Sequence, residues 1–155
     1  MPGKDHSAKV REEFIEKIGV IAQAEGLPRI AGRVFALLCY DGTRVSFSEL
    51  AEQLAVSRGS ISSSVRQLEQ LQVIKRVAKP GDRQDYFQMA EDAFVTLIES
   101  SALRVRRAQA EIVATLKDLG SADEGPRQRL TQYADFYGVM DSALHAAADT
   151  LKDAE

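Results

Sequence analysis

The side chains that could do chemistry are concentrated between Glu49 and Glu69, in the sequence ELAEQLAVSRGSISSSVRQLE. A small residue where two helices touch, followed by apolar residues that lock the second helix, is typical of a helix-turn-helix. Ala51 would be the small residue, with Leu54, Ile61, Val65 and Leu68 forming the lock. The outer face of the second helix would then carry Gly59, Ser60, Ser62, Ser63, Arg66 and Gln67, with Ser64 as a fourth serine of the cluster.

This outer face is unusual for a helix that only meets water, because serines are mediocre helix formers and a solvated face normally carries Glu and Lys. Glycine and serine allow close approach to a groove of DNA, and the hydroxyls supply small donors. One arginine fork can bind a guanine edge or a phosphate. A solvated face is the alternative, and the surrounding pattern favours a DNA-reading surface.

A basic hairpin is predicted directly after this helix, because two short β-prone runs, 74–78 and 85–89, flank the turn sequence KPGDRQ. Its basic residues are Lys75, Arg76, Lys79 and Arg83. A flexible basic tip can follow phosphates and place an arginine in a narrow minor groove. We expect Asp82 to orient the guanidinium of Arg83. The expected DNA contacts are Ser57, Arg58, Ser60, Ser62, Ser63, Arg66, Gln67, Lys79, Arg83 and Gln84.

Helices must position these residues. Apolar residues at spacings of three and four predict an N-terminal helix, ended by Gly26 and Pro28, and a second helix that stops near 41–42. The apolar stripe of the first helix is Val10, Phe14, Ile18 and Ile21 or Ala22, and that of the second is Ile30, Val34, Leu37 and Leu38. Cys39 is expected to be buried in the second helix. Ser46 and Glu49 predict a capping box that begins the third helix.

After Met89 the pattern is helical, with a polar break at 121–125. The apolar stripes of 7–24, 92–119 and 126–152 are longer than one small domain can cover, so we expect a homodimer interface. An intramolecular helical hairpin is the alternative. The fold class is therefore mainly α with a small β-hairpin, divided into a dimerisation helix (1–27), a winged helix-turn-helix (28–89) and C-terminal dimerisation helices (90–155).

The charges are segregated in agreement with this division. Basic and acidic side chains number four and five in 1–27, nine and six in 28–89, and seven and twelve in 90–155. A basic middle between acidic flanks is expected of a DNA reader with separate oligomerisation helices. A chance imbalance of a few charges is the alternative.

Several classes of function are disfavoured. One cysteine and two distant histidines argue against a disulfide framework and a metal site, and no catalytic or phosphate-loop spacing is present. We therefore expect no enzyme, cofactor or metal. The longest apolar run, 34–40, is too short for a membrane span, and the first residues lack a secretory pattern. A cytoplasmic protein without a membrane partner is expected.

The order of these elements, with LPRIAGRVFALL in the second helix and GDRQDYF in the hairpin, resembles the MarR superfamily of winged-helix regulators and its GbsR-like branch. The resemblance implies a homodimer on pseudo-palindromic double-stranded operator DNA, usually a repressor, with a small-molecule effector. Gln84 stands where many members have a second arginine. Ala55 replaces a glycine that is frequent at the turn, which is tolerable if the turn does not need a positive φ.

Two rival functions and one effector hypothesis accompany this interpretation. A winged-helix protein–protein adaptor has no need of the basic hairpin, and a non-specific architectural DNA binder does not fit the acidic surroundings. Tyr133, Phe136 and Tyr137, near Asp135 and Asp141, could form a cage for a quaternary ammonium. Packing in a dimer core is the favoured alternative for these aromatic residues.

Overall fold

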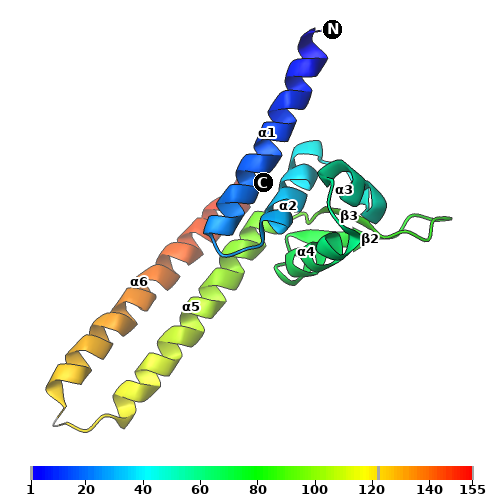
Figure 1. Cartoon of the computed structure of the whole chain (residues 1–155). Helices are drawn as coiled ribbons and strands as arrows, with labels where there is room; N and C mark the ends of the chain where they lie inside the picture. Colours follow the sequence, from blue (N-terminus) through cyan, green and yellow to red (C-terminus); the bar gives the residue numbers. More distant parts are fainter. Residues whose placement is uncertain (1, 122, 155) are drawn as a thin grey trace. The chain divides into compact units, whose positions relative to one another are not determined.

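The computed structural model describes residues 2–121 and 123–154, with side chains from Asp5 onward. The chain is mostly helical with one small sheet, which confirms the predicted fold class (Figure 1). It divides into two compact units, one reaching to Ala93 and one beginning at Phe94. The first unit holds the helix-turn-helix and the sheet, and the second holds the two C-terminal helices.

Helices α1 (Pro2–Ala24) and α2 (Arg29–Asp41) pack closely because glycines lie at their contact. A Cβ at Gly32 would overlap the Cβ of Ala22, and one at Gly19 would lie 3.2 Å from the carbonyl oxygen of Arg29. The link between the helices uses Gly26 with φ 87°, so the predicted left-handed glycine cap is confirmed.

The packed stripe of α1 differs from the prediction. Ile15, Gly19 and Ala22 are buried, whereas Val10 and Ile21 remain 42% and 51% exposed. The glycine contact, rather than the largest apolar residues, thus sets which face of α1 meets α2, and part of the predicted stripe stays exposed.

Cys39 is exposed, so its expected burial was wrong. The buried face of α2 is formed by Ala31, Val34, Leu37 and Leu38. Cys39 is one residue beyond Leu38. Each residue turns the helix by about 100°, so the side chain of Cys39 points away from the core.

The helix-turn-helix consists of α3 (Phe47–Leu54) and α4 (Arg58–Gln70). The predicted capping box is present, since Ser46 Oγ accepts from Glu49 N and Glu49 Oε2 accepts from Ser46 N. The turn residue Ala55 has φ 52° and ψ 46°. A left-handed alanine therefore joins the two helices, so the condition of a turn without positive φ is not met.

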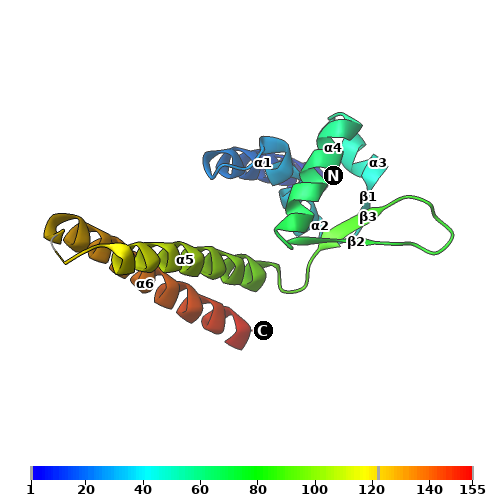
Figure 2. The same cartoon turned by 90° about the horizontal axis from the view of Figure 1, so that it is seen from below.

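A three-stranded antiparallel sheet completes the first unit, in the order β1 (Val45–Ser46), β3 (Tyr86–Met89), β2 (Ile74–Val77). Val45 pairs with Phe87, and Val77 pairs with Tyr86. The β2–β3 connection extends beyond the strands as the predicted wing (Figure 2). Phe87 of β3 is fully buried, and it belongs to the core together with Leu37, Leu38, Leu50 and Ile61.

The second unit is an antiparallel hairpin of α5 (Ala93–Asp118) and α6 (Glu124–Asp153). Small buried residues let the two helices approach, among them Ala102, Ala134 and Ala148. The amide of Gln109 donates to the carbonyl oxygen of Ala134 at 3.1 Å. Within residues 2–121 and 123–154, no helix has the length and hydropathy needed to cross a bilayer.

Candidate DNA-binding surface

The amino end of α4 is built by serines that cap it. Ser57 Oγ accepts from Ser60 N at 3.1 Å and forms a second hydrogen bond with Ser60 Oγ at 2.9 Å. An N-cap of this kind satisfies one of the free amide groups of the first turn. Ser57 and Ser60 therefore have a structural task at the helix end in addition to any contact with a ligand.

The outer face of α4 agrees in part with the prediction. Ser63 and Arg66 are exposed, and Ser62 is half-buried. Ser64 was wrongly grouped with this face, because it is 1% exposed and lies on the side of Ile61 and Val65. The positions 60, 63 and 67 follow one another at helical spacing, whereas position 64 falls on the buried stripe.

Gln67 is less available than expected. Its side chain is half-buried, and its Oε1 atom is buried without a hydrogen-bond partner among the described residues. The amide oxygen is thus turned toward the protein. Only the amide nitrogen could serve the predicted contact.

Arg58 is held against α3 by two contacts. Its Cζ atom lies 4.7 Å from the ring centroid of Phe47, and Nη1 donates to Ser48 Oγ at 3.3 Å. Stacking on an aromatic ring leaves the edge of a guanidinium available for hydrogen bonds. Arg58 is thus pre-positioned at the beginning of α4.

Asp82 organises the wing in a way that differs from the prediction. Its Oδ2 accepts from the hydroxyl of Tyr86 at 2.7 Å, and its Oδ1 accepts from Gln84 N at 2.9 Å. These bonds hold the pKa of Asp82 below its ordinary value, the Tyr86 hydroxyl being the main cause. No described carboxylate lies within ion-pair distance of Arg83, so the expected orientation of its guanidinium by Asp82 was wrong.

Tyr86 also brings together two cations from different parts of the sequence. Arg44 Cζ lies 6.0 Å and Lys79 Nζ 5.8 Å from its ring centroid. Sequence reasoning missed Arg44 because no local motif marks it. The pairing of β1 with β3, in which Ser46 is opposite Tyr86, brings this arginine to the base of the wing.

The cations of the winged helix fall into two groups. Of the nine basic side chains in residues 28–89, four are bound to carboxylates, namely Arg29, Arg33, Lys75 and Arg76. The other five have no described carboxylate within 4.0 Å, and they are Arg44, Arg58, Arg66, Lys79 and Arg83. All five lie on α4, on the wing or just before β1. Lys75 and Arg76 thus do not add to the free charge of the hairpin, contrary to expectation.

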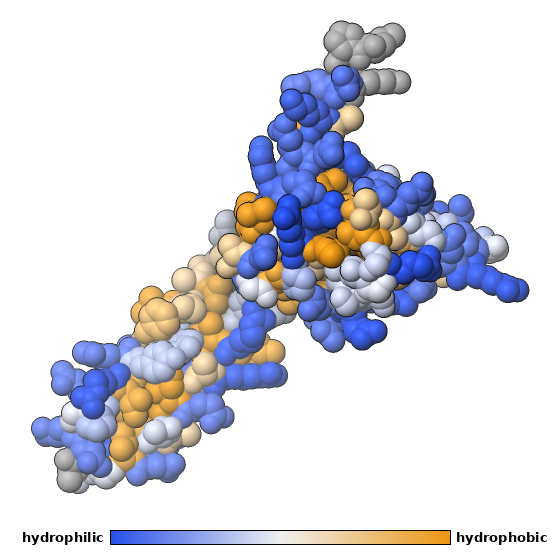
Figure 3. All heavy atoms as spheres, viewed as in Figure 1, coloured by the Kyte–Doolittle hydropathy of each residue, from blue (hydrophilic) through white to orange (hydrophobic). Residues whose placement is uncertain are grey.

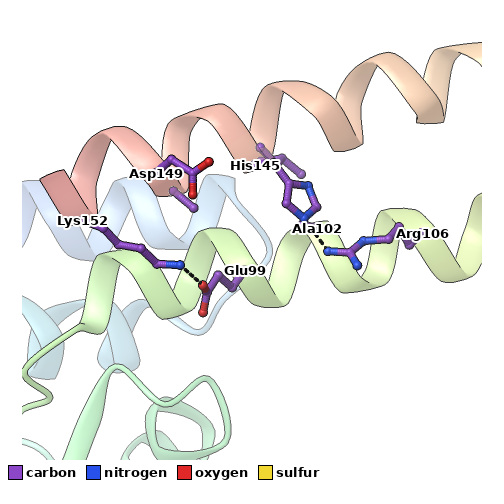
Figure 4. A pocket seen from close by; sticks show the side chains of 8 residues that line it. Glu99, Ala102, Arg106, His145, Asp149 and Lys152 are labelled. Atoms are coloured by element: carbon purple, nitrogen blue, oxygen red, sulfur yellow. Dashed lines mark hydrogen bonds and ion pairs between the residues drawn. The ribbon is translucent and has the colours of Figure 1, made fainter.

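The second unit contains a small pocket between α5 and α6, with a volume of about 160 Å³ (Figure 4). Its charged groups bind one another: Lys152 Nζ lies 2.6 Å from Glu99 Oε1, and Arg106 Nη2 is 2.7 Å from His145 Nε2. Arg106 Nε also donates to Asp141 at 3.1 Å. Apart from Asp149, the charged side chains that line the pocket are thus already engaged with other side chains of the described chain.

The predicted aromatic cluster is present on α6. The rings of Tyr133 and Tyr137 are 5.0 Å apart and their hydroxyls 3.2 Å, and Phe136 lies edge-on to Tyr137. Asp141 is engaged by Arg106. The rings therefore contact one another, and of the two nearby carboxylates Asp141 is paired whereas Asp135 is exposed. No group of three metal-binding side chains occurs in the described part of the chain.

Comparisons with known proteins agree with this architecture. A family model described as MarR family matches residues 25–85. The transcriptional regulator MmpR5 of Mycobacterium tuberculosis (strain ATCC 25618 / H37Rv) is 34% identical over 136 residues, covering 87% of this chain and 82% of MmpR5. A crystal structure of a transcriptional regulator is 31% identical, with a TM-score of 0.79, and covers 92% of this chain and 98% of that chain.

A shorter match is found to the transcriptional repressor OpcR of Bacillus subtilis (strain 168), 29% identical over 87 residues. It covers 56% of this chain and 47% of OpcR. The fold, the wing and these relatives define a winged-helix DNA-binding regulator of transcription. The chain belongs to the MarR family. This membership confirms the family-level prediction and the expectation that the protein is not an enzyme.

Proposed function

We propose that this protein is a homodimeric, ligand-responsive repressor of the GbsR-like branch that binds a pseudo-palindromic operator. The observation that carries the DNA contacts is the separation of the nine cations into four that are paired and five that are free. If this surface only met water, the five unpaired cations would not be expected to cluster on the recognition helix, on the wing and just before β1. Phosphate contacts need cations that are not already neutralised.

In this proposal each protomer places α4 in a major groove and the tip of the wing in the neighbouring minor groove. Ser63 and Arg66 face base edges, while Arg44, Arg58 and Lys79 bind phosphates. Arg83 enters the minor groove, where a narrow groove attracts arginine. Ser57, Ser60, Ser62, Gln67 and Gln84 are supporting contacts.

The homodimer is supported by apolar side chains that the monomer leaves exposed. Val139 and Phe136 of α6 are 72% and 53% exposed, and Val20 and Ile21 of α1 are about half exposed. Figure 3 shows apolar residues gathered along the α5–α6 hairpin on the face in view. Contiguous exposed apolar surface of this kind marks an interaction site. Light scattering should give twice 17.0 kDa; a monomer that binds the whole operator with full affinity would contradict the dimer.

Repression is supported by one of the relatives. OpcR carries the word repressor in its name, and the resemblance to the GbsR-like branch comes from the sequence motifs. The cytoplasmic location also stays a prediction. An adaptor without specific DNA binding is disfavoured because it leaves the free cations without a role.

The salt dependence of operator binding tests this proposal. If Arg44, Arg58 and Lys79 of each protomer touch phosphate, six contacts per dimer give a slope of log K against log salt of about −5. Arg58→Ala should reduce the slope by about 2, because each dimer loses two contacts. Arg107→Ala, an equal loss of charge on the exposed surface of α5, is the control and should leave the slope unchanged. A wild-type slope near zero would favour the adaptor.

A further inference from the structure

Arg11 of α1 joins three helices of the first unit through its guanidinium group. Nε donates to Oδ1 of Asp41 at 2.7 Å, and Nη2 donates to Oδ2 of Asp41 at 2.6 Å. The same Nη2 donates to Oε1 of Gln53 at 2.8 Å. Asp41 is the last residue of α2, and Gln53 is the last but one of α3. Arg11 thus reaches from one long helix to the ends of two others.

The location of Gln53 makes this contact important for DNA recognition. Gln53 lies two residues before Ala55, whose left-handed backbone turns the chain, and four residues before Ser57, the N-cap of α4. No other side-chain hydrogen bond between described residues joins α1 to α3. The position of the helix-turn-helix turn relative to α1 therefore depends on this contact and on packing through α2.

The geometry also explains why arginine occupies position 11. Its planar fork binds both oxygens of Asp41 and still presents an N–H to Gln53, which a lysine ammonium cannot do with the same fixed geometry. The side chains of Arg11 and Asp41 are only 28% and 23% exposed, so solvent screens this pair less than a fully exposed one. The positive group also lies at the carboxyl end of α2, where it is favourable for the helix dipole.

We propose that Arg11 is a positioning residue for operator recognition: through Gln53 it fixes the turn before α4 relative to α1. This inference rests on the proposed dimer, in which α1 belongs to the dimer interface. The contact then sets the separation and angle of the two recognition helices. The contact therefore determines which half-site spacings the dimer accepts. It does not change the affinity of each recognition helix for its own half-site.

Operators with altered spacing between half-sites test this role. One added base pair moves a half-site by about 3.4 Å and rotates it by about 35°, so a rigid dimer loses affinity. We compare wild type, Gln53→Ala and Arg11→Lys on operators with spacers changed by one and two base pairs, and on a single half-site. The control is Gln23→Ala, the same chemical change on the exposed side of α1 where the side chain has no described contact.

Gln53→Ala and Arg11→Lys should reduce the penalty for wrong spacing by about fivefold, the scale of the net contribution of one partly exposed hydrogen bond. Their single half-site affinity should stay within about twofold of wild type, and the control should keep the wild-type spacing preference. An unchanged penalty in both variants would overturn the inference. So would an equal loss of affinity on the single half-site, because Gln53 would then act as a direct DNA contact.

A measurement without DNA separates this inference from the proposed function. Val56 N donates to the carbonyl oxygen of Ala51 at the turn. Gln53→Ala should speed amide exchange of Val56 by about fivefold, while exchange in the centre of α2 is unchanged. Faster exchange together with no DNA binding by wild type would refute the proposed function alone. Unchanged exchange of Val56 with normal wild-type DNA binding would refute the positioning role alone.

Discussion

The hydroxyl of Tyr86 donates a 2.7 Å hydrogen bond to Oδ2 of Asp82 across the base of the wing. Asp82 Oδ1 at the same time accepts from the backbone N–H of Gln84. Arg83 therefore lies between Asp82 and Gln84, which are joined by this carboxylate. The wing tip is ordered by this local network and by Gly81, which has φ 80°.

The Tyr86–Asp82 contact predicts the titration of Asp82. Its folded-state pKa is lowered, chiefly by the Tyr86 hydroxyl, so ionised Asp82 favours the ordered wing above the unfolded pKa of about 3.9. That contribution is lost as pH falls through the lower folded pKa. Tyr86→Phe should raise the pKa of Asp82, measured from its carboxyl carbon by NMR. Tyr40→Phe on α2 is the control, and an unmoved pKa in Tyr86→Phe would contradict the assignment.

A second prediction separates the two DNA-reading elements. Arg83→Ala should weaken binding to every operator variant by about 1–3 kcal/mol, with the larger loss where the flanking sequence is A·T-rich. Ser63→Ala should instead reduce discrimination between bases, with a loss at the low end of about 1–3 kcal/mol. Competition assays on a panel of operator variants measure both effects.

Ser60→Ala is the matched comparison for Ser63→Ala, because Ser60 bonds to the N-cap Ser57. Its change should weaken all sequences alike through the end of α4, without altering base preference. The wing assignment would be wrong if Arg83→Ala left affinity intact while Ser63→Ala abolished binding to every sequence.

The turn between α3 and α4 predicts a stabilising substitution. Ala55 has φ 52°, a conformation that costs an L-residue about 1–2 kcal/mol and a glycine almost nothing. Glycine also has more backbone entropy than alanine in the unfolded chain, which lowers the free energy of unfolding by about 0.4–1 kcal/mol. Ala55→Gly should therefore stabilise the protein by about 0.5–1 kcal/mol, measured by urea unfolding.

The control for this substitution is Ala78→Gly. Ala78 is exposed, lies outside the helices and strands, and has no positive φ. Ala78→Gly relieves no backbone strain, so it should destabilise the protein by about 0.4–1 kcal/mol. Equal effects of the two substitutions would show that the turn at Ala55 carries no strain.

The α1–α2 contact predicts a loss of stability. Gly32→Ala would push a methyl group into Ala22 and toward the carbonyl oxygen of Ile18, 2.9 Å away, so the helices must separate. Such overpacking costs about 1–3 kcal/mol. In α4, a Cβ at Gly59 meets nothing closer than 3.9 Å, so Gly59→Ala should stabilise by up to about 1 kcal/mol. Urea unfolding of both variants checks the contrast, and similar stability changes would contradict the close contact.

The sequence by itself determined the local elements of this protein. Ser46 and Glu49 specify the beginning of α3, Ser57 caps α4, and Gly81 makes the wing turn, because caps and turns depend on residues a few positions apart. The apolar spacing likewise predicted each long helix. These signals are short-range, so they can be read without knowing the fold.

Only the tertiary structure decided which charges are free and which residues hold the DNA-binding elements in place. Arg76 belongs to the basic cluster of the hairpin in the sequence, but the fold pairs it with Glu69 and Asp85. Arg44 gained importance only through the pairing of β1 with β3. Arg11 and Gln53 are 42 residues apart. Contacts at such separation depend on how the helices pack, and no local spacing encodes that packing.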